Sequence, residues 1–258
     1  MPNNLSFIKN KSVENFYTLI QKQILKEIVN SKKQPNSHND FEEWIKINKK
    51  KYLKKTYKIL EIGPGFTGNW LKILKKNNFK NLYALDINTE TVSELKKLKF
   101  INVKHGSVLK LPYKDNYFDF VICYGVIHHT SNPPKAFSEV FRVTKKNGYS
   151  YIGLYLFRDS AFEYIVRIWR IIGKYTSYKI VHKLVKNVSS LNRFFLDHTY
   201  VPILNLYNSN EVKQIFDNKN FTIIEDKANK FDFFQRIPVL GKIMTGSGLL
   251  RYYFVKKN

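Results

Sequence analysis

The chain is poor in cysteine, since Cys123 is the only one among 258 residues. One cysteine cannot form an intrachain disulfide or supply the ligands of a cysteine-based zinc site. No uninterrupted apolar run approaches the roughly 18 residues that a membrane-spanning helix needs. The first residues, MPNNLSFIKNK, contain no apolar stretch suited to a secretory signal. These absences predict a reducing, cytoplasmic setting and no bound metal.

Acidic residues are also scarce, with 20 Asp and Glu against 44 Lys and Arg, giving a formal net charge of +24. Such an excess attracts polyanions, so nucleic acid and anionic lipid are both candidate partners. The basic residues are spread along the whole chain, as a general bias towards Lys, Asn, Ile, Phe and Tyr would produce. No RNA-binding signature is visible, and we therefore predict no nucleic-acid partner. Peripheral contact with an anionic membrane, at the inner membrane surface, stays open as an alternative.

Strand and helix patterns alternate along most of the chain, which predicts βαβ units and a doubly wound, mostly parallel, Rossmann-like α/β sheet. A C-terminal hairpin is expected to add an antiparallel strand to it. The expected strands are 56–63, 81–87, 100–108, 118–126, 149–157, 221–228 and 249–257. The expected helices are 41–53, 69–78, 88–98, 133–148 and 208–220.

The stretch KILEIGPGFTGNW, residues 58–70, carries three glycines with the spacing G-x-G-x-x-G. In an open α/β sheet this loop follows the first strand and lines the ligand site at the carboxyl ends of the strands. Asp86 ends the next strand, where a carboxylate can accept both hydroxyls of a ribose. These features fit a dinucleotide and an adenosine compound equally well.

Two features of the loop favour a cationic ligand over a pyrophosphate. Glu61 precedes the first glycine by two residues, and its carboxylate would repel a pyrophosphate. Pro64 removes one backbone N–H donor, and Phe66 adds bulk, which makes the loop a poor cradle for phosphate.

The later segments resemble those of the class I S-adenosylmethionine-dependent methyltransferases, in particular the small-molecule and quinone-type enzymes. The resemblance covers roughly residues 40–155, and the tail 209–258 fits the last helix and hairpin of that family. The motifs that carry it are Glu61-Ile62-Gly63-Pro64-Gly65, Asp86, the run from Gly106 to Asp119, His128-His129 and the run from Arg142 to Gly148.

The resemblance implies S-adenosyl-L-methionine as cofactor and assigns roles to particular residues. Glu61 would organise the loop, Gly63 and Gly65 would flank the methionyl part, and Tyr124 would lie at its end. Asp86 would hold the ribose, Ile87 would pack on the adenine, and Ser107 and Val108 would lie at the adenine edge. Apart from the resemblance, Phe66 is available as an aromatic face near the cationic sulfur. The family commonly has Asp where this chain has Ser107, and a neutral hydroxyl is the weaker acceptor for the adenine amino group.

Two histidines are candidates for a general base acting on the methyl acceptor. His129 belongs to the histidine pair at the mouth of the expected site, and His198 lies further along the chain next to Asp197. For His129, packing in a turn is the alternative interpretation.

The chain is expected to divide into a cofactor-binding domain and an insertion. Residues 1–158 and 209–258 form the Rossmann-like domain, with 1–50 as an N-terminal helical cap, and residues 159–208 form a helical substrate lid without strands. In this lid Arg167, Arg170 and Lys174 share one helical face, and the isoleucines lie largely on another. The helix would lie on a membrane or grip an anionic substrate, or it would pack its apolar face on the sheet; the last is the expectation.

The sequence therefore predicts a methyltransferase that acts on a small or lipophilic metabolite through an oxygen or carbon atom. A membrane-associated quinone or lipid methyltransferase is the first alternative. An RNA methyltransferase and a non-catalytic cofactor-binding protein are the others. The identity of the acceptor and the oligomeric state are not predicted.

Overall fold

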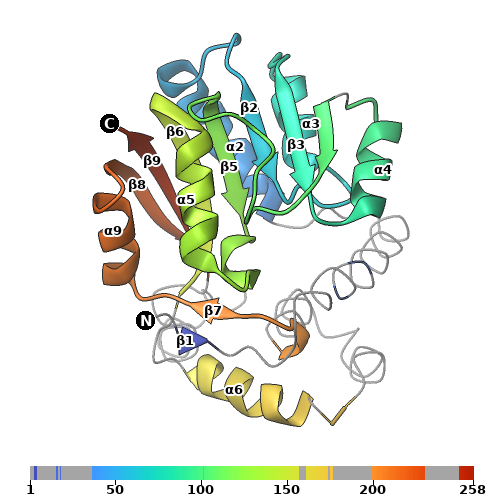
Figure 1. Cartoon of the computed structure of the whole chain (residues 1–258), viewed down its shortest axis with the longest axis vertical. Coiled ribbons are helices and arrows are strands. Elements are labelled where there is room, and N and C mark those ends of the chain that lie inside the picture. Colours follow the sequence, from blue (N-terminus) through green and yellow to red (C-terminus); the bar gives the residue numbers. More distant parts are fainter. Residues whose placement is uncertain are drawn as a thin grey trace.

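A seven-stranded mixed sheet is the centre of the molecule (Figure 1). The computed structural model describes residues 3–4, 16, 18, 37–100, 102–156, 161–173, 175–176, 199–229 and 250–258. The strands follow the order β4-β3-β2-β5-β6-β9-β8, in which β9 alone runs opposite to the other six. Their bounds are β2 Ile59–Ile62, β3 Leu82–Asp86, β4 Asn102–His105, β5 Phe118–Tyr124, β6 Thr144–Tyr155, β8 Phe221–Asn229 and β9 Leu250–Lys257. The predicted fold class is confirmed.

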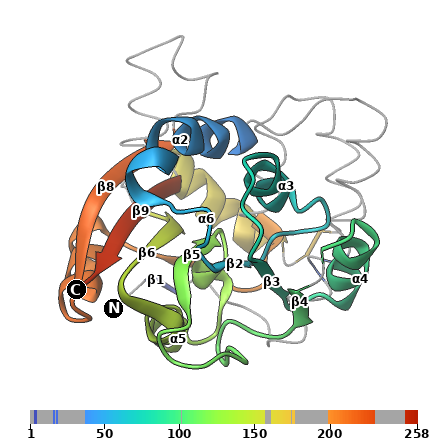
Figure 2. The same ribbon diagram turned by 90° about the horizontal axis from the view of Figure 1, so that it is seen from above.

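Helices cover both faces of this sheet (Figures 1 and 2). On one face lie α2 Ser37–Tyr52, α3 Asn69–Lys76 and α4 Thr89–Lys97, and on the other lie α5 Pro133–Val143 and α9 Ser209–Asp217. Each layer has its own hydrophobic core, one rich in Phe and Trp under α2 and α3, the other built on Phe137, Val140 and Phe216 under α5 and α9. Burial of these apolar side chains is the main stabilising contribution.

The helix after β5 is shorter than predicted, because it ends at Val143 and not at Gly148. Thr144 takes an extended conformation, its hydroxyl donates to the Val140 carbonyl at 2.7 Å, and the chain enters β6 directly. Asn147 then turns the chain with a φ of 61°. The glycine that suggested a helix end belongs instead to a turn inside the early part of β6.

The prediction of a strand-free insertion is wrong at its end. The two-residue strand β7, Asn205–Leu206, pairs antiparallel with β1, Asn3–Asn4. Residues around β7 are buried, namely Val201, Ile203, Leu204, Leu206 and Tyr207. In Figure 1 this segment crosses beyond the carboxyl ends of β3 and β5, where it closes one side of the molecule.

Helix α6, Ala161–Gly173, in the predicted insertion, presents the opposite face from the one expected. Arg170 is buried, with 4% of its surface exposed, whereas Ile168 and Ile171 are 58% and 61% exposed. The guanidinium is turned inward because it donates to the backbone carbonyls of Thr199 and Val201, at 3.5 and 3.0 Å. The expected packing of the isoleucines on the sheet is therefore wrong.

Candidate functional site

A cavity of about 260 Å³ opens at the carboxyl ends of β2, β3 and β5. This is the edge at which open α/β sheets bind their ligands. Its walls come from the glycine loop, the end of β3, the turn after β4 and the segment after β5, and the lining residues are Ile62, Gly63, Leu85, Asp86, Ile87, Gly106, Ser107, Val108, Leu109, Gly125, Val126, His129, Thr130 and Ser131.

Gly63 sets the shape of the loop above β2. Its φ is +72°, and a Cβ built on it would lie 2.5 Å from the Cγ2 atom of Val126. A larger residue would be strained and would also push the segment after β5 away. The Gly63 N–H donates to the Leu85 carbonyl at 2.8 Å, which ties the loop to the end of β3.

Asp86 is a buried carboxylate in the cavity wall, with 5% of its surface exposed. Its Oδ1 accepts the N–H of Asn88 at 2.8 Å, and its Oδ2 accepts the N–H of Gly65 at 3.4 Å. These bonds fix the carboxylate against both the glycine loop and the start of α4. Asn88 caps α4 and also donates to the Thr18 hydroxyl at 2.7 Å, so a residue of the N-terminal region reaches this corner of the site.

Glu61 lies behind the glycine loop and does not line the cavity. Its carboxyl group accepts a backbone hydrogen bond from Leu71 in the first turn of α3, and its Oε2 atom is buried without a partner. Burial raises the pKa of Glu61 from 4.5 to about 8, and the nearby Asp86 charge adds to the rise. A buried carboxyl group that lacks one hydrogen-bond partner is suited to a donor or a cation arriving from the site.

Three predicted residues form the wall beyond Asp86, namely Ile87, Ser107 and Val108. The backbone carbonyl of Ile87 accepts a hydrogen bond from His105 Nε2 at 2.9 Å. The Ser107 hydroxyl accepts the N–H of Leu109 at 3.2 Å, so it stabilises its own turn as well as facing the cavity.

Gly65, Phe66 and Tyr124 do not line this cavity. The Tyr124 ring packs on Trp70 and Tyr151, with centroids 4.7 and 6.1 Å away. Gly153 on β6 makes room for it, because a Cβ there would lie 2.2 Å from the ring. The position at the end of β5 is as predicted, but the side chain points to the aromatic core under α2 and α3.

The histidine pair lies in a 3₁₀ turn, η1 Ile127–His129, with both side chains buried. His129 lines the cavity, and its Nδ1 atom lies 2.9 Å from the Ile203 carbonyl. A carbonyl can only accept, so Nδ1 carries the proton and the neutral ring has its basic lone pair on Nε2. His198, the other candidate base, lies outside the described residues, as does its neighbour Asp197.

Asn205 of β7 holds the histidine turn from the other side. Its side-chain amide donates to the backbone carbonyls of His128 and Thr130, at 3.2 and 2.9 Å. Asn205 was not predicted as a site residue, although the sequence holds one signal: it is a lone amide inside the apolar run VPILNLY. A buried amide needs partners, and it finds them in the turn.

Gly125, Thr130 and Ser131, which complete the wall after β5, were not predicted either. Their signal was proximity in sequence to the histidine pair, at a point where a strand ends at the binding edge.

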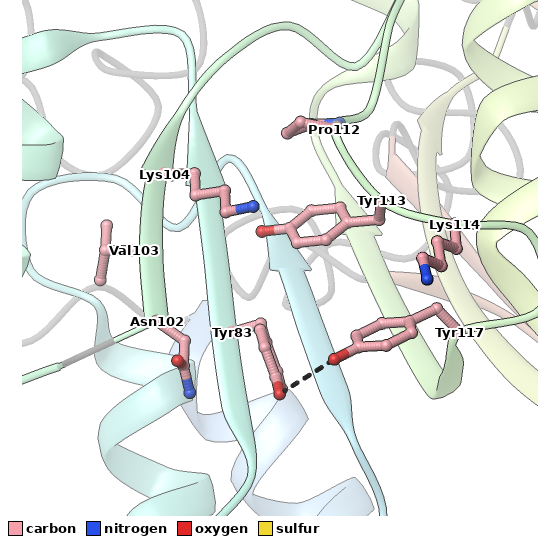
Figure 3. A pocket seen from close by; sticks show the side chains of 8 residues that line it. All are labelled: Tyr83, Asn102, Val103, Lys104, Pro112, Tyr113, Lys114 and Tyr117. Carbon is pink, nitrogen blue, oxygen red and sulfur yellow. Dashed lines mark hydrogen bonds between the residues drawn. The ribbon is translucent and has the colours of Figure 1, made fainter.

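A second hollow, of about 350 Å³, lies at the opposite edge of the sheet, near the amino ends of β3, β4 and β5 (Figure 3). Three tyrosines and two lysines make up most of its lining. The hydroxyls of Tyr83 and Tyr117 are 3.5 Å apart, and Lys104 Nζ lies 4.9 Å from the Tyr113 ring centroid. It contains no carboxylate and no glycine loop, and none of the predicted site residues.

In the described ranges, no three or more His, Cys, Asp or Glu side chains gather as a metal site would require. Among the helices of the same ranges, none has both the length and the apolar content needed to cross a bilayer.

The sequence comparisons agree on the central part of the chain. Residues 60–152 match a family model described as a methyltransferase domain. A methyltransferase-like protein of Schizosaccharomyces pombe is 34% identical over 120 residues, which is 45% of each chain. A protein of Methanocaldococcus jannaschii is 38% identical over 109 residues, 42% of this chain and 45% of the relative. The chain thus aligns with less than half the length of these curated relatives.

Solved structures share the fold over most of the chain. A chain of the Haloferax volcanii complex between the Trm112 methyltransferase activator and a methyltransferase has a TM-score of 0.61 at 12% identity, covering 95% of this chain and 96% of that one. An S-adenosylmethionine-dependent methyltransferase of Methanosarcina mazei has a TM-score of 0.52 at 17% identity, covering 80% and 94%. A [4+2]-cyclase, with a TM-score of 0.54 at 12% identity over 84% and 80%, also has this fold. At such identities the likeness concerns the fold alone, and the reaction has to be argued from the site.

Proposed function

Because residues 60–152 form a class I S-adenosylmethionine-dependent methyltransferase domain, we propose that this chain transfers a methyl group to a small or lipophilic acceptor. The acceptor atom in this proposal is an oxygen or a carbon. The observation that carries it is the pairing of a carboxylate in the cavity wall, Asp86, with the glycine loop that closes above it.

The described residues fit the ribose and the methionyl part of the cofactor. Asp86 is fixed at the end of β3, where its oxygens can accept ribose hydroxyls in addition to the two backbone N–H groups. Glu61 offers a buried oxygen without a partner, and an ammonium group nearby would favour its ionised form. The absence of a side chain on Gly63 lets the ligand approach the loop backbone.

S-adenosylmethionine supplies a methyl group activated on a sulfonium, so its leaving group needs no protonation. The protein therefore has to align the acceptor, exclude water and, for a hydroxyl or carbon acid, remove a proton. Segment 201–207 supports the exclusion of water because it lies buried beyond the carboxyl ends of the strands.

His129 is the residue to which we assign proton removal. It lines the cavity, and the Ile203 carbonyl holds its Nδ1–H, which directs the basic Nε2 of the neutral ring away from that bond. Asn205 is a positioning residue in this scheme, since it holds the backbone on both sides of His129.

The direct test is product formation from the cofactor. The full chain is incubated with S-adenosylmethionine labelled on its methyl carbon and with separate pools of phenols, quinols and fatty acids. We expect acceptor-dependent release of S-adenosylhomocysteine together with label in one organic-soluble pool. Release without an acceptor pool, or binding without transfer to any pool, would overturn the proposal.

A further inference from the structure

The outer face of α6 is an apolar stripe in a chain with a large excess of positive charge. It consists of Tyr164, Ile165, Ile168, Ile171 and Ile172, continued beyond the helix by Tyr175. With 100° between successive residues, these six positions fall within about 120° of arc. Large apolar side chains gathered on one exposed face mark an interaction surface and not scattered surface residues.

The opposite face of α6 is fixed to the protein. Arg170 is buried and bonded to the carbonyls of Thr199 and Val201, and the Thr176 hydroxyl just beyond the helix lies 2.8 Å from the Tyr200 hydroxyl. The helix therefore cannot turn its isoleucines inward without breaking a buried charged contact, which is costly. The apolar stripe is held outward.

The net charge of the chain indicates what covers the stripe. The whole chain carries +24, and the sequence between residues 157 and 200 has eight Lys and Arg residues against three Asp and Glu residues. Arg167 borders the stripe at the next helical position around the axis. A helix that lies on an anionic bilayer has this composition: isoleucines for the acyl boundary, tyrosines for the interface, and a bordering arginine in a strongly basic chain.

We propose that α6 docks the protein on an anionic lipid surface through this stripe. The proposal goes beyond methyl transfer and does not require it. In Figure 1, α6 lies on the side of the molecule towards which the carboxyl ends of β3 and β5 point. Docking there would bring the site to the bilayer, so the acceptor class that fits best is a lipophilic molecule dissolved in the membrane.

Vesicle binding of the full chain tests the proposal. We expect co-sedimentation with vesicles of phosphatidylcholine and phosphatidylglycerol, at least tenfold weaker binding to phosphatidylcholine alone, and weakening by salt. Ile168→Glu combined with Ile171→Glu should lower binding to the anionic vesicles by at least tenfold. The matched control is Ile47→Glu on α2, because Ile47 is 65% exposed on another helix and its loss should leave binding within twofold of wild type.

Tryptophan fluorescence gives a second readout in the same samples. The chain has three tryptophans, and Trp44 and Trp70 are buried in the core, so quenching by brominated lipid reports on Trp169 of α6. We expect quenching in the wild type and the Ile47 control and none in the α6 variant. Three results would overturn the proposal: no binding of the wild type, equal binding of the α6 variant, or a dimer in sedimentation that the α6 variant alone dissociates. The last would make a second copy the occupant.

Discussion

The two edges of the central sheet carry hollows of similar size and opposite chemistry. At the carboxyl edge a cavity of about 260 Å³ is lined by glycines and the Asp86 carboxylate, and at the amino edge a hollow of about 350 Å³ is lined by tyrosines and lysines. The hollow at the amino edge has no carboxylate, no histidine and no glycine loop in its lining. Burial raises the pKa of its Tyr113 to about 12, which keeps that phenol protonated. Volume does not identify the site, whereas the type and fixation of its polar groups do.

The largest expected effect is on the rate, at His129. His129→Gln removes the base and should lower the turnover of a hydroxyl acceptor by about 10² to 10⁴, while S-adenosylhomocysteine affinity stays within about threefold of wild type. The control at the other edge is Tyr117→Phe, which we expect to leave turnover unchanged. Equal losses of rate and cofactor affinity in His129→Gln would mean that the residue supports structure and does not accept the proton.

The next effect is on binding, at Asp86. Asp86→Ala removes a buried acceptor of ribose hydroxyls and should weaken cofactor binding by about 100-fold, as expected for hydrogen bonds to a charged group. Tyr83→Phe, which removes one hydroxyl at the amino edge, should leave the dissociation constant within twofold. Calorimetric titration of both variants measures the contrast. If both variants bound the cofactor comparably weakly, the carboxyl edge could not be assigned as the cofactor site.

A pH-dependent effect on stability is expected at Glu61. Its pKa is about 8 in the folded protein against 4.5 for an ordinary Glu, so the folded state holds the proton more tightly than the unfolded state. Unfolding free energy should therefore fall as pH rises from about 4.5 to 8, and level off above that range. Glu61→Gln keeps the uncharged form and removes this loss, by an amount on the order of a few kcal/mol.

Urea unfolding without cofactor checks the sign. Glu61→Gln should be more stable than wild type at pH 9 and about equal to it at pH 4, while cofactor binding is weakened. A variant less stable than wild type at pH 9 would show that the carboxylate is already satisfied in the ligand-free protein.

The smallest expected effect concerns Ser107 in the cavity wall. Ser107→Asp offers a charged acceptor to the adenine amino group and can still accept the N–H of Leu109. We expect cofactor binding to tighten about fivefold, with no change in the affinity for an analogue that lacks the adenine amino group. Equal tightening for both ligands would point to a general charge effect and away from that hydrogen bond.

The sequence predicted the parts of the molecule that depend on local pattern. The strands and helices around the glycine loop were predicted within a few residues, and Gly63, Asp86, Ser107 and His129 do meet in one cavity. These positions follow from the rule that consecutive parallel strands bring their carboxyl ends to one edge. The topology of the sheet alone therefore brings these residues to one edge.

Side-chain direction was harder to predict, as two amphipathic helices demonstrate. On α5 the apolar side chains Phe137 and Val140 pack into the core, as the period indicates. On α6 the same kind of stripe faces outward, because Arg170 finds backbone carbonyls in segment 199–201. The helical period shows which residues share a face, but not what that face packs against. The packing partner is a segment that lies far away in the sequence. The directions of Tyr124 and Asn205 depend on long-range partners in the same way.

Isothermal titration of the full chain with S-adenosylhomocysteine and with NADH tests the central claim most directly. We expect one molecule of S-adenosylhomocysteine bound per chain in wild type and in Tyr83→Phe, strong weakening in Asp86→Ala, and no heat with NADH. Saturable binding of NADH that depends on Asp86, or no binding of S-adenosylhomocysteine by wild type, would contradict the assignment of the carboxyl edge.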